Sequence, residues 1–163
     1  MRIAVSNDHA GFALKPVVVD LLHELGHEVV DVGTDSDDPV DFPLMTQRVT
    51  DLVVGGRADR GLLVCGTGVG AAIAANKVPG IRAAVIHDTF VARQGVEHDD
   101  VNVACLGAWV VGRVIAQDVV RAFLGATFST DADFRRRVQQ LSDLETAAAR
   151  SGRTADGGPE GGR

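Results

Sequence analysis

Five short apolar runs alternate along the chain with longer stretches in which apolar residues recur every three or four positions. The runs cover residues 2–6, 28–33, 61–65, 82–86 and 101–106. The periodic stretches cover residues 12–25, 44–54, 71–77, 89–97, 110–124 and 133–150. Short apolar runs are typical of strands buried in a parallel sheet, and the wider spacing is typical of amphipathic helices. The pattern therefore predicts a three-layer α/β fold around a five-stranded parallel sheet.

The polar residues that follow the first and third strands are predicted to share one site. In sheets of this kind, ligands bind beyond the carboxyl ends of the strands, where the strand order reverses. With the flavodoxin-like strand order 2-1-3-4-5, the first and third strands would be neighbours at that point. The first strand is followed by Asp8 and His9, and the third ends in the sequence C-G-T-G-V-G at 65–70. The topology therefore predicts that these two clusters meet.

Three glycines in five residues separate the third strand from the helix after it. Glycine lets the backbone approach a ligand closely, and the positive end of the helix dipole would lie behind the turn. The turn from Gly66 to Gly70 therefore predicts a cradle of backbone N–H groups for an anion. Beside it, Cys65 is expected to have a lowered thiol pKa and to act as a base or nucleophile. A tight turn beside a small buried hydrophobic residue is the alternative.

The composition argues against several classes of function. The net charge of −6 argues against nucleic acid as the main partner. The histidines are dispersed and no C-x-x-C spacing occurs, so we expect neither a metal nor a cofactor. Cys65 and Cys105 lie in apolar runs, which favours a reducing cytoplasm over a disulfide framework. We expect no signal peptide and no membrane span.

The chain is predicted to form a single domain over residues 1–150. Its length suffices for one α/β domain with a sizeable core. Residues 151–163 are rich in glycine and lack apolar anchors, which predicts a disordered tail.

Seven short motifs together resemble the ribose-5-phosphate isomerase B family, which includes the galactose-6-phosphate isomerase subunits. They are D-H-A-G at 8–11, G-T at 33–34, D-F-P at 41–43, C-G-T-G-V-G at 65–70, I-A-A-N-K at 73–77, G-I-R at 80–82 and H-D-D-V-N at 98–102. The resemblance implies a Rossmann-like α/β domain without a metal, assembled as a homodimer or a dimer of dimers. It also implies aldose–ketose isomerisation of a sugar phosphate through a cis-enediolate.

The resemblance assigns a role to each matching residue. Cys65 would move the proton between C1 and C2, and Thr67 would assist proton transfer at the oxygens. Asp8 and His98 would assist ring opening, and the C-terminal helix would reach the site of a dimer partner. The residues implied to bind the substrate are His9, Gly66, Gly68, Val69, Gly70, Asp99 and Arg137.

Four positions depart from the family's usual pattern, and two of them concern the substrate's phosphate. Phe42 replaces a tyrosine, Asp99 an asparagine, and Trp109 and Asp133 replace arginines that usually bind phosphate. Asp133 is expected to pair with Arg136 or Arg137 on the same helix. D-ribose 5-phosphate is the default substrate. The alternatives are another small sugar or sugar phosphate, such as erythrulose 4-phosphate or an unphosphorylated sugar, and a metabolite-binding module without catalysis.

Overall fold

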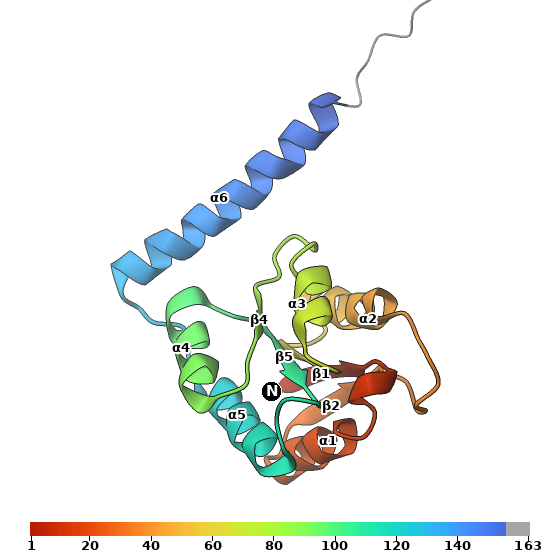
Figure 1. Ribbon diagram of the computed structural model, residues 1–163. Coiled ribbons are helices and arrows are strands. Elements are labelled where there is room, and N and C mark those ends of the chain that lie inside the picture. The colour runs from red at the N-terminus through yellow and green to blue at the C-terminus, as the bar shows by residue number, and fades with distance from the viewer. Residues whose placement is uncertain (156–163) are drawn as a thin grey trace, which may run out of the picture. The chain divides into compact units, whose positions relative to one another are not determined.

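The computed structural model describes the backbone of residues 1–155 and the side chains of residues 1–150. The chain forms two compact units, Met1–Phe128 and Ser129–Arg163. In the first unit, five parallel strands form one sheet (Figure 1). They are β1 (Arg2–Asn7), β2 (Glu28–Asp31), β3 (Arg60–Cys65), β4 (Ala83–Val85) and β5 (Val103–Gly107). This confirms the predicted five-stranded parallel sheet.

The strand order is β2-β1-β3-β5-β4, so the predicted order 2-1-3-4-5 is wrong in its last two strands. β5 lies between β3 and β4, and in the pairing of β3 with β5 the residue opposite Cys65 is Gly107. All five residues of β5 are buried, whereas the three residues of β4 are only half-buried. The more deeply buried strand β5 thus takes the inner position, and β4 forms the edge. As a result, the chain that leaves β5 passes directly beside the end of β3.

Helices cover both faces of this sheet (Figure 1). One face carries α1 (Lys15–Glu24), α4 (Thr89–Asp99) and α5 (Arg113–Gly125), and the other carries α2 (Phe42–Val54) and α3 (Val69–Ala75). Successive strand residues point to opposite faces. Leu62 and Val64 accordingly pack with α1, α4 and α5, whereas Leu63 packs with α2 and α3. The predicted three-layer arrangement is confirmed.

The two apolar layers differ in the size of their side chains. The layer of α1, α4 and α5 is filled by large residues, among them the fully buried Phe123. In contrast, α3 packs on the sheet through Ala71, Ala72 and Ala75. Small side chains let a helix lie close to the sheet. The turn before α3 is therefore held near the carboxyl ends of β3 and β5.

The second unit is built on the long helix α6 (Ala132–Ala155). Its N-terminus is capped by Asp131, whose Oδ1 accepts a hydrogen bond from the Asp133 N–H at 2.8 Å. The helix continues five residues past the predicted end at residue 150. The rest of the predicted tail, residues 156–163, lies outside the described residues. Among residues 1–155, no helix is long and apolar enough to cross a membrane.

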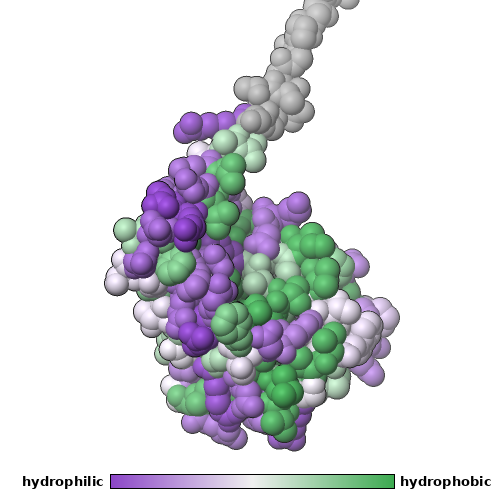
Figure 2. Space-filling view, turned by 60° about the vertical axis from the view of Figure 1, so that its left-hand side comes forward, coloured by the Kyte–Doolittle hydropathy of each residue, from purple (hydrophilic) through white to green (hydrophobic). Residues whose placement is uncertain are grey.

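Apolar side chains also reach the surface of the first unit, where they lie between hydrophilic areas (Figure 2). On α3, Val69 and Ile73 are exposed, and on α5 so are Val114 and Ile115. Both pairs lie in the first turns of their helices, near the carboxyl edge of the sheet. Exposed apolar areas of this kind are typical of interaction surfaces.

Candidate active site

Asp8 and Cys65 lie at the ends of two neighbouring strands and contact each other. The Asp8 N–H donates to the Val64 carbonyl at 3.2 Å, which continues the pairing of β1 with β3. The Cys65 thiol in turn donates a hydrogen bond to the Asp8 carboxylate. Asp8 is buried, with 6% of its surface exposed, and Cys65 is half-buried. The structure therefore brings together the two clusters that the topology was expected to join.

A short 3₁₀ helix, η1 (His9–Gly11), fixes the Asp8 side chain. The carboxylate Oδ1 accepts a hydrogen bond from the Gly11 N–H at 2.9 Å. A Cβ atom at residue 11 would lie 2.0 Å from the Val64 carbonyl oxygen, so only glycine lets η1 approach β3 this closely. Gly11 is thus a residue of the site that the sequence interpretation did not single out, although it is part of the D-H-A-G motif.

The pKa of the Cys65 thiol is raised, and the expectation that it would be lowered is wrong. Burial of the thiol is the largest cause, and the hydrogen bond to the Asp8 carboxylate is the next. The N–H groups of Gly68 and Gly66 act in the opposite direction, as expected for a cradle of amides, but they are outweighed. At neutral pH, Cys65 therefore holds its proton, and its thiolate is a stronger base than that of an ordinary cysteine.

The turn after Cys65 has the backbone conformation that an amide cradle requires. Gly68 has φ +79° and ψ −16°, in the left-handed region, and it directly precedes α3. A Cβ atom at this position would also lie 3.0 Å from the carbonyl oxygen of Cys105. Thr67 is exposed, and its Oγ1 accepts a hydrogen bond from the Val69 N–H at 3.4 Å. The cradle thus presents the Thr67 hydroxyl and the Val69 side chain to solvent.

Two glycines of the cradle each lie against an aromatic ring. A Cβ atom at Gly66 would lie 2.7 Å from Cζ3 of Trp109, and one at Gly70 would lie 3.1 Å from the ring of Phe42. The Trp109 N–H also donates to the Gly66 carbonyl at 2.9 Å. These glycines therefore serve a second purpose besides backbone freedom, because they make room for the two rings that flank the cradle.

His87 lies beside the same turn. Its Nε2 accepts a hydrogen bond from the Gly107 N–H at 3.1 Å, so the proton of the neutral ring is on Nδ1. A Cβ atom at Gly107 would lie 2.8 Å from that Nε2 and 2.9 Å from the carbonyl oxygen of Thr67. The position of His87 next to Thr67 places it at the edge of the candidate site.

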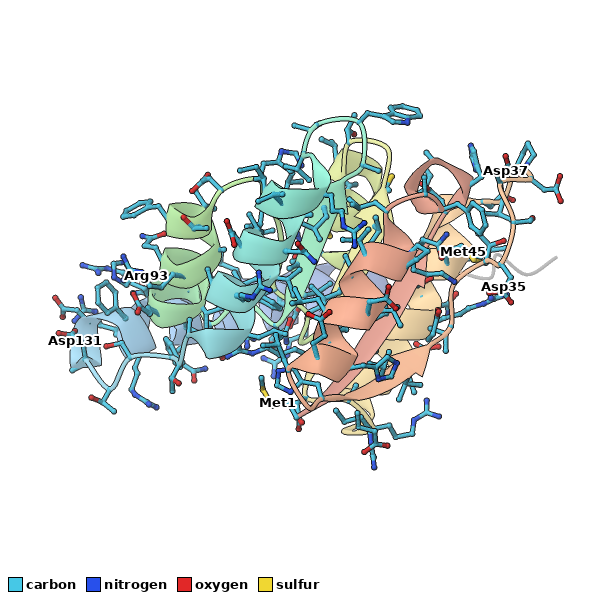
Figure 3. All side chains as sticks on the ribbon, turned by 90° about the horizontal axis from the view of Figure 1, so that it is seen from below. Met1, Asp35, Asp37, Met45, Arg93 and Asp131 are labelled. Atoms are coloured by element: carbon cyan, nitrogen blue, oxygen red, sulfur yellow. The ribbon has the colours of Figure 1, made fainter. Side chains whose placement is uncertain are left out.

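His9 extends the site on the opposite side, at the end of β1. Its Nδ1 accepts a hydrogen bond from the Val40 N–H at 3.3 Å, so the neutral ring carries its proton on Nε2. The ring lines a cavity of about 480 Å³ whose other walls include Asp41 and Met45. The same loop carries Asp35 and Asp37, which lie at this end of the molecule (Figure 3).

The structure does not bring His98 and Asp99 to this site within one chain. Both lie in the last turn of α4, which begins after the carboxyl end of β4 and runs back toward the opposite edge of the sheet. The next residue, Asp100, accepts hydrogen bonds from Arg82 at 2.5 and 2.7 Å, just before β4 begins. His98 and Asp99 are therefore at the amino edge of the sheet, whereas Cys65 is at the carboxyl edge.

Arg137 belongs to α6 in the second unit. Its Nη2 lies 3.8 Å from Asp133 Oδ2, and Arg136 donates to Asp133 Oδ1 at 2.5 Å. The expected pairing of Asp133 within its own helix is thus confirmed, and the hydrogen bond from Arg136 lowers the pKa of Asp133. The Arg137 guanidinium also lies over the ring of Phe134, 5.7 Å from its centre. These groups are exposed, so each pair contributes little to stability.

The fold and the site define a class: Rossmann-like α/β proteins with a thiol and a carboxylate at the edge of an amide cradle. The family model described as Ribose/Galactose Isomerase matches residues 3–141, and the chain belongs to this family. The resemblance carried by the seven motifs is thereby confirmed.

Several relatives cover nearly the whole chain. Ribose-5-phosphate isomerase B of Escherichia coli (strain K12) is 42% identical over 144 residues, which are 88% of this chain and 96% of that protein. D-erythrulose-4-phosphate isomerase 2 of Mycolicibacterium smegmatis is 36% identical over 150 residues, 90% of this chain and 99% of that one. The solved structure of Clostridium thermocellum ribose-5-phosphate isomerase B has a TM-score of 0.88 at 42% identity and covers 91% of this chain and 99% of its own. The structure of ribose-5-phosphate isomerase B from Mycoplasma genitalium with bound ribulose-5-phosphate has a TM-score of 0.84 at 34% identity. The match covers 89% of this chain and 96% of that one.

Proposed function

We propose that the protein is an aldose–ketose isomerase that interconverts a sugar phosphate through a cis-enediolate, with D-ribose 5-phosphate and D-ribulose 5-phosphate as the default pair. The observation that carries the proposal is the hydrogen-bonded pair of Cys65 and Asp8 beside the N–H groups of Gly66 and Gly68. A base next to an oxyanion site is what proton abstraction α to a carbonyl requires. Family membership and the names of the relatives support the same reaction.

In the proposed reaction, the thiolate of Cys65 takes the proton from C2 of the open-chain aldose. The electron pair of that C–H bond forms the C1–C2 double bond, and the carbonyl oxygen becomes an oxyanion held by the cradle amides. The Cys65 thiol then returns the proton to C1, while Thr67 assists transfer of the hydroxyl proton between the two oxygens. The Asp8 carboxylate, which accepts the hydrogen bond of the thiol, would assist opening of the sugar ring before the first step.

The binding set is completed by groups on both sides of the cradle. The N–H groups from Gly66 to Gly70, with Val69 between them, would hold the enediolate, and His9 would donate from Nε2 to the substrate's polar tail. A binding module without catalysis would need no base. The presence of the Cys65–Asp8 pair therefore favours the isomerase. Because the base is a thiol that works only when reduced, the reducing cytoplasm is the compartment that fits it.

The working form is at least a dimer, either a homodimer or a dimer of dimers. Asp8 and Cys65 lie at one edge of the sheet, whereas His98 and Asp99 lie at the other, so only a second copy can supply the last two to the same site. Arg137 lies in the separate second unit and would likewise act on a neighbouring copy. The exposed apolar residues near the cradle, such as Ile73 and Val114, are the kind that a subunit interface covers.

The chemistry is tested with D-ribose 5-phosphate in D₂O, where NMR follows deuterium at C2 of the aldose and C1 of the ketose. Incorporation of solvent deuterium at these carbons supports the enediolate mechanism, because the proton on Cys65 can exchange with solvent before it returns to carbon. Cys65→Ala is expected to lower kcat about 10²- to 10⁴-fold, the usual contribution of a positioned base. Cys105→Ala is the matched control, since Cys105 is buried in the sheet and is expected to leave kcat unchanged. Near-wild-type turnover by Cys65→Ala would overturn the assignment.

The shared site is tested by mixing two inactive variants, Cys65→Ala and His98→Ala, in one refolded sample. If each site takes Cys65 from one copy and His98 from the other, a mixed dimer has one site with both residues intact. A statistical mixture should then recover about a quarter of the wild-type activity. If the mixture shows only the sum of its two inactive parents, His98 does not act across the interface.

A further inference from the structure

Trp109 is the most exposed large apolar side chain among the described residues, with 74% of its surface open. Its backbone is nevertheless fixed, because the Trp109 N–H donates to the Gly66 carbonyl at 2.9 Å. The six-membered part of the indole lies against Gly66, where Cζ3, Cε3 and Cη2 would be 2.7 to 3.0 Å from an added Cβ atom. The indole therefore stands as a wall at the β5 side of the cradle, with its remaining surface facing solvent.

On the His9 side of the cradle, the polar surroundings are acidic. The loop after β2 carries four carboxylates, Asp35, Asp37, Asp38 and Asp41, and Asp41 lines the cavity beside His9. Lys15 does not offset them, because its ammonium group is already bound. It lies 3.0 Å from Asp31 Oδ2, 3.4 Å from Asp35 Oδ1 and 2.9 Å from the Thr34 carbonyl. A phosphate dianion that extends from the cradle toward this loop meets like charge.

We propose that Trp109 sets the length of the sugar and selects four-carbon over five-carbon sugar phosphates, a proposal that rests on the isomerase function above. The reacting carbons have to lie at Cys65 and the cradle amides, so a longer chain meets the indole where it extends toward β5 and the loop carboxylates where it extends toward His9. An indole offers an apolar face and a single N–H donor, which suits the C–H surface of a sugar better than a dianion. A chain shorter by one carbon keeps its phosphate nearer the cradle amides and farther from the loop carboxylates.

The proposal is tested by measuring kcat/KM for D-erythrose 4-phosphate and D-ribose 5-phosphate. The wild type should prefer the four-carbon substrate. Trp109→Ala should shift the ratio toward the five-carbon substrate about 10- to 100-fold, the range that one methylene group usually contributes in a shaped pocket. Trp109→Phe should shift it less. Val110→Ala shortens the neighbouring apolar side chain of the same turn, which is also exposed, and should leave the ratio unchanged.

Two kinetic results would overturn the proposal. One is a wild type that prefers D-ribose 5-phosphate, and the other is a Trp109→Ala variant in which both kcat/KM values change by the same factor. Failure of the wild type to turn over either sugar phosphate would overturn the proposed isomerase function itself, and this inference with it. Circular dichroism melting of Trp109→Ala checks that the variant is folded, as expected for so exposed a side chain.

A second measurement does not depend on turnover. The chain has one tryptophan and no tyrosine, so its intrinsic emission above 300 nm reports on Trp109 alone. In the Cys65→Ala variant, D-erythrulose 4-phosphate should shift the emission to shorter wavelength and protect it from acrylamide, because the sugar covers the exposed indole. Inorganic phosphate, which has no carbon chain, should protect it less. If calorimetry detects binding of D-erythrulose 4-phosphate while emission and quenching stay unchanged, Trp109 does not contact the sugar and the proposal fails.

Discussion

Replacing Gly11 with alanine would add one methyl group at the contact between η1 and β3. The new Cβ atom would lie 2.0 Å from the Val64 carbonyl oxygen and 3.0 Å from the Cys65 nitrogen. An ordinary carbon–oxygen contact is about 3.5 Å, so the overlap exceeds about 1 Å. Both neighbouring atoms belong to the backbone of a central strand and cannot rotate away. The variant therefore either keeps the overlap or moves η1, and Asp8 with it, away from β3.

Each of these two responses costs a similar amount of stability. Keeping the overlap costs about 1–3 kcal/mol, the usual penalty of overpacking. Moving η1 breaks the bond from the Asp8 N–H to Val64, worth about 0.5–1.5 kcal/mol, and the bond from the Cys65 thiol to the Asp8 carboxylate, worth about 1.5–3 kcal/mol. We therefore expect Gly11→Ala to lower the free energy of unfolding by about 2–4 kcal/mol.

Urea unfolding followed by circular dichroism measures this loss, and the isomerase assay measures its effect on the site. Because a displacement of about 1 Å in a catalytic group costs about 10²-fold in rate, kcat should fall by about that factor. Gly125→Ala is the matched control: a Cβ atom there meets nothing within 4 Å, and the added methyl should stabilise the last turn of α5 by up to about 1 kcal/mol. A Gly11→Ala variant with wild-type unfolding free energy and kcat would refute the close-approach argument.

Two predictions concern the thiols. Asp8→Asn keeps an acceptor for the Gly11 N–H but removes the negative charge, so the pKa of Cys65 should fall and iodoacetamide should alkylate it faster at neutral pH. An unchanged or slower rate would contradict the role of Asp8. Burial raises the pKa of Cys105, so the unfolded chain loses this proton first and stability falls as pH rises above about 8.5. Urea titrations between about pH 8 and 10 should show a shallower decline of the unfolding free energy in Cys105→Ala than in the wild type. An equally steep decline in both proteins would contradict the role of Cys105.

The periodicity of the sequence was sufficient to predict the layers and the parallel sheet, because burial imposes it on every strand and helix. It did not determine which of the last two strands lies inside, since both runs are apolar and short. The three residues of β4 follow Arg82, which is bound to Asp100, whereas β5 is buried throughout. Short strands are typical of sheet edges, and β4 has three residues against five in β5.

The site was predictable to the extent that it depends on topology. Strands β1 and β3 are neighbours in both the predicted and the observed order, which is why Asp8 and Cys65 meet. Whether the pKa of Cys65 is raised or lowered was not predictable from the neighbouring residues in the sequence. Nearby amides are visible in the sequence of the turn, but the depth of burial and the hydrogen bond from the thiol across the strands are properties of the packed structure. The packing of Trp109 on Gly66 likewise follows from the inner position of β5.

The raised pKa of Cys65 is compatible with the proposed role of this thiol as a base. A proton α to a carbonyl is very weakly acidic, so a base of higher pKa gains driving force, although less of it is ionised at rest. The amides of Gly66 and Gly68 favour the thiolate, while burial and Asp8 favour the thiol. When an enediolate oxygen occupies those amides, they no longer stabilise the thiolate, and Cys65 holds the abstracted proton more firmly. When the oxyanion collapses to a carbonyl, the amides are released and the proton can return to carbon. The cradle would thus couple the charge on the substrate to the basicity of the thiol, which a cysteine with a permanently low pKa could not do.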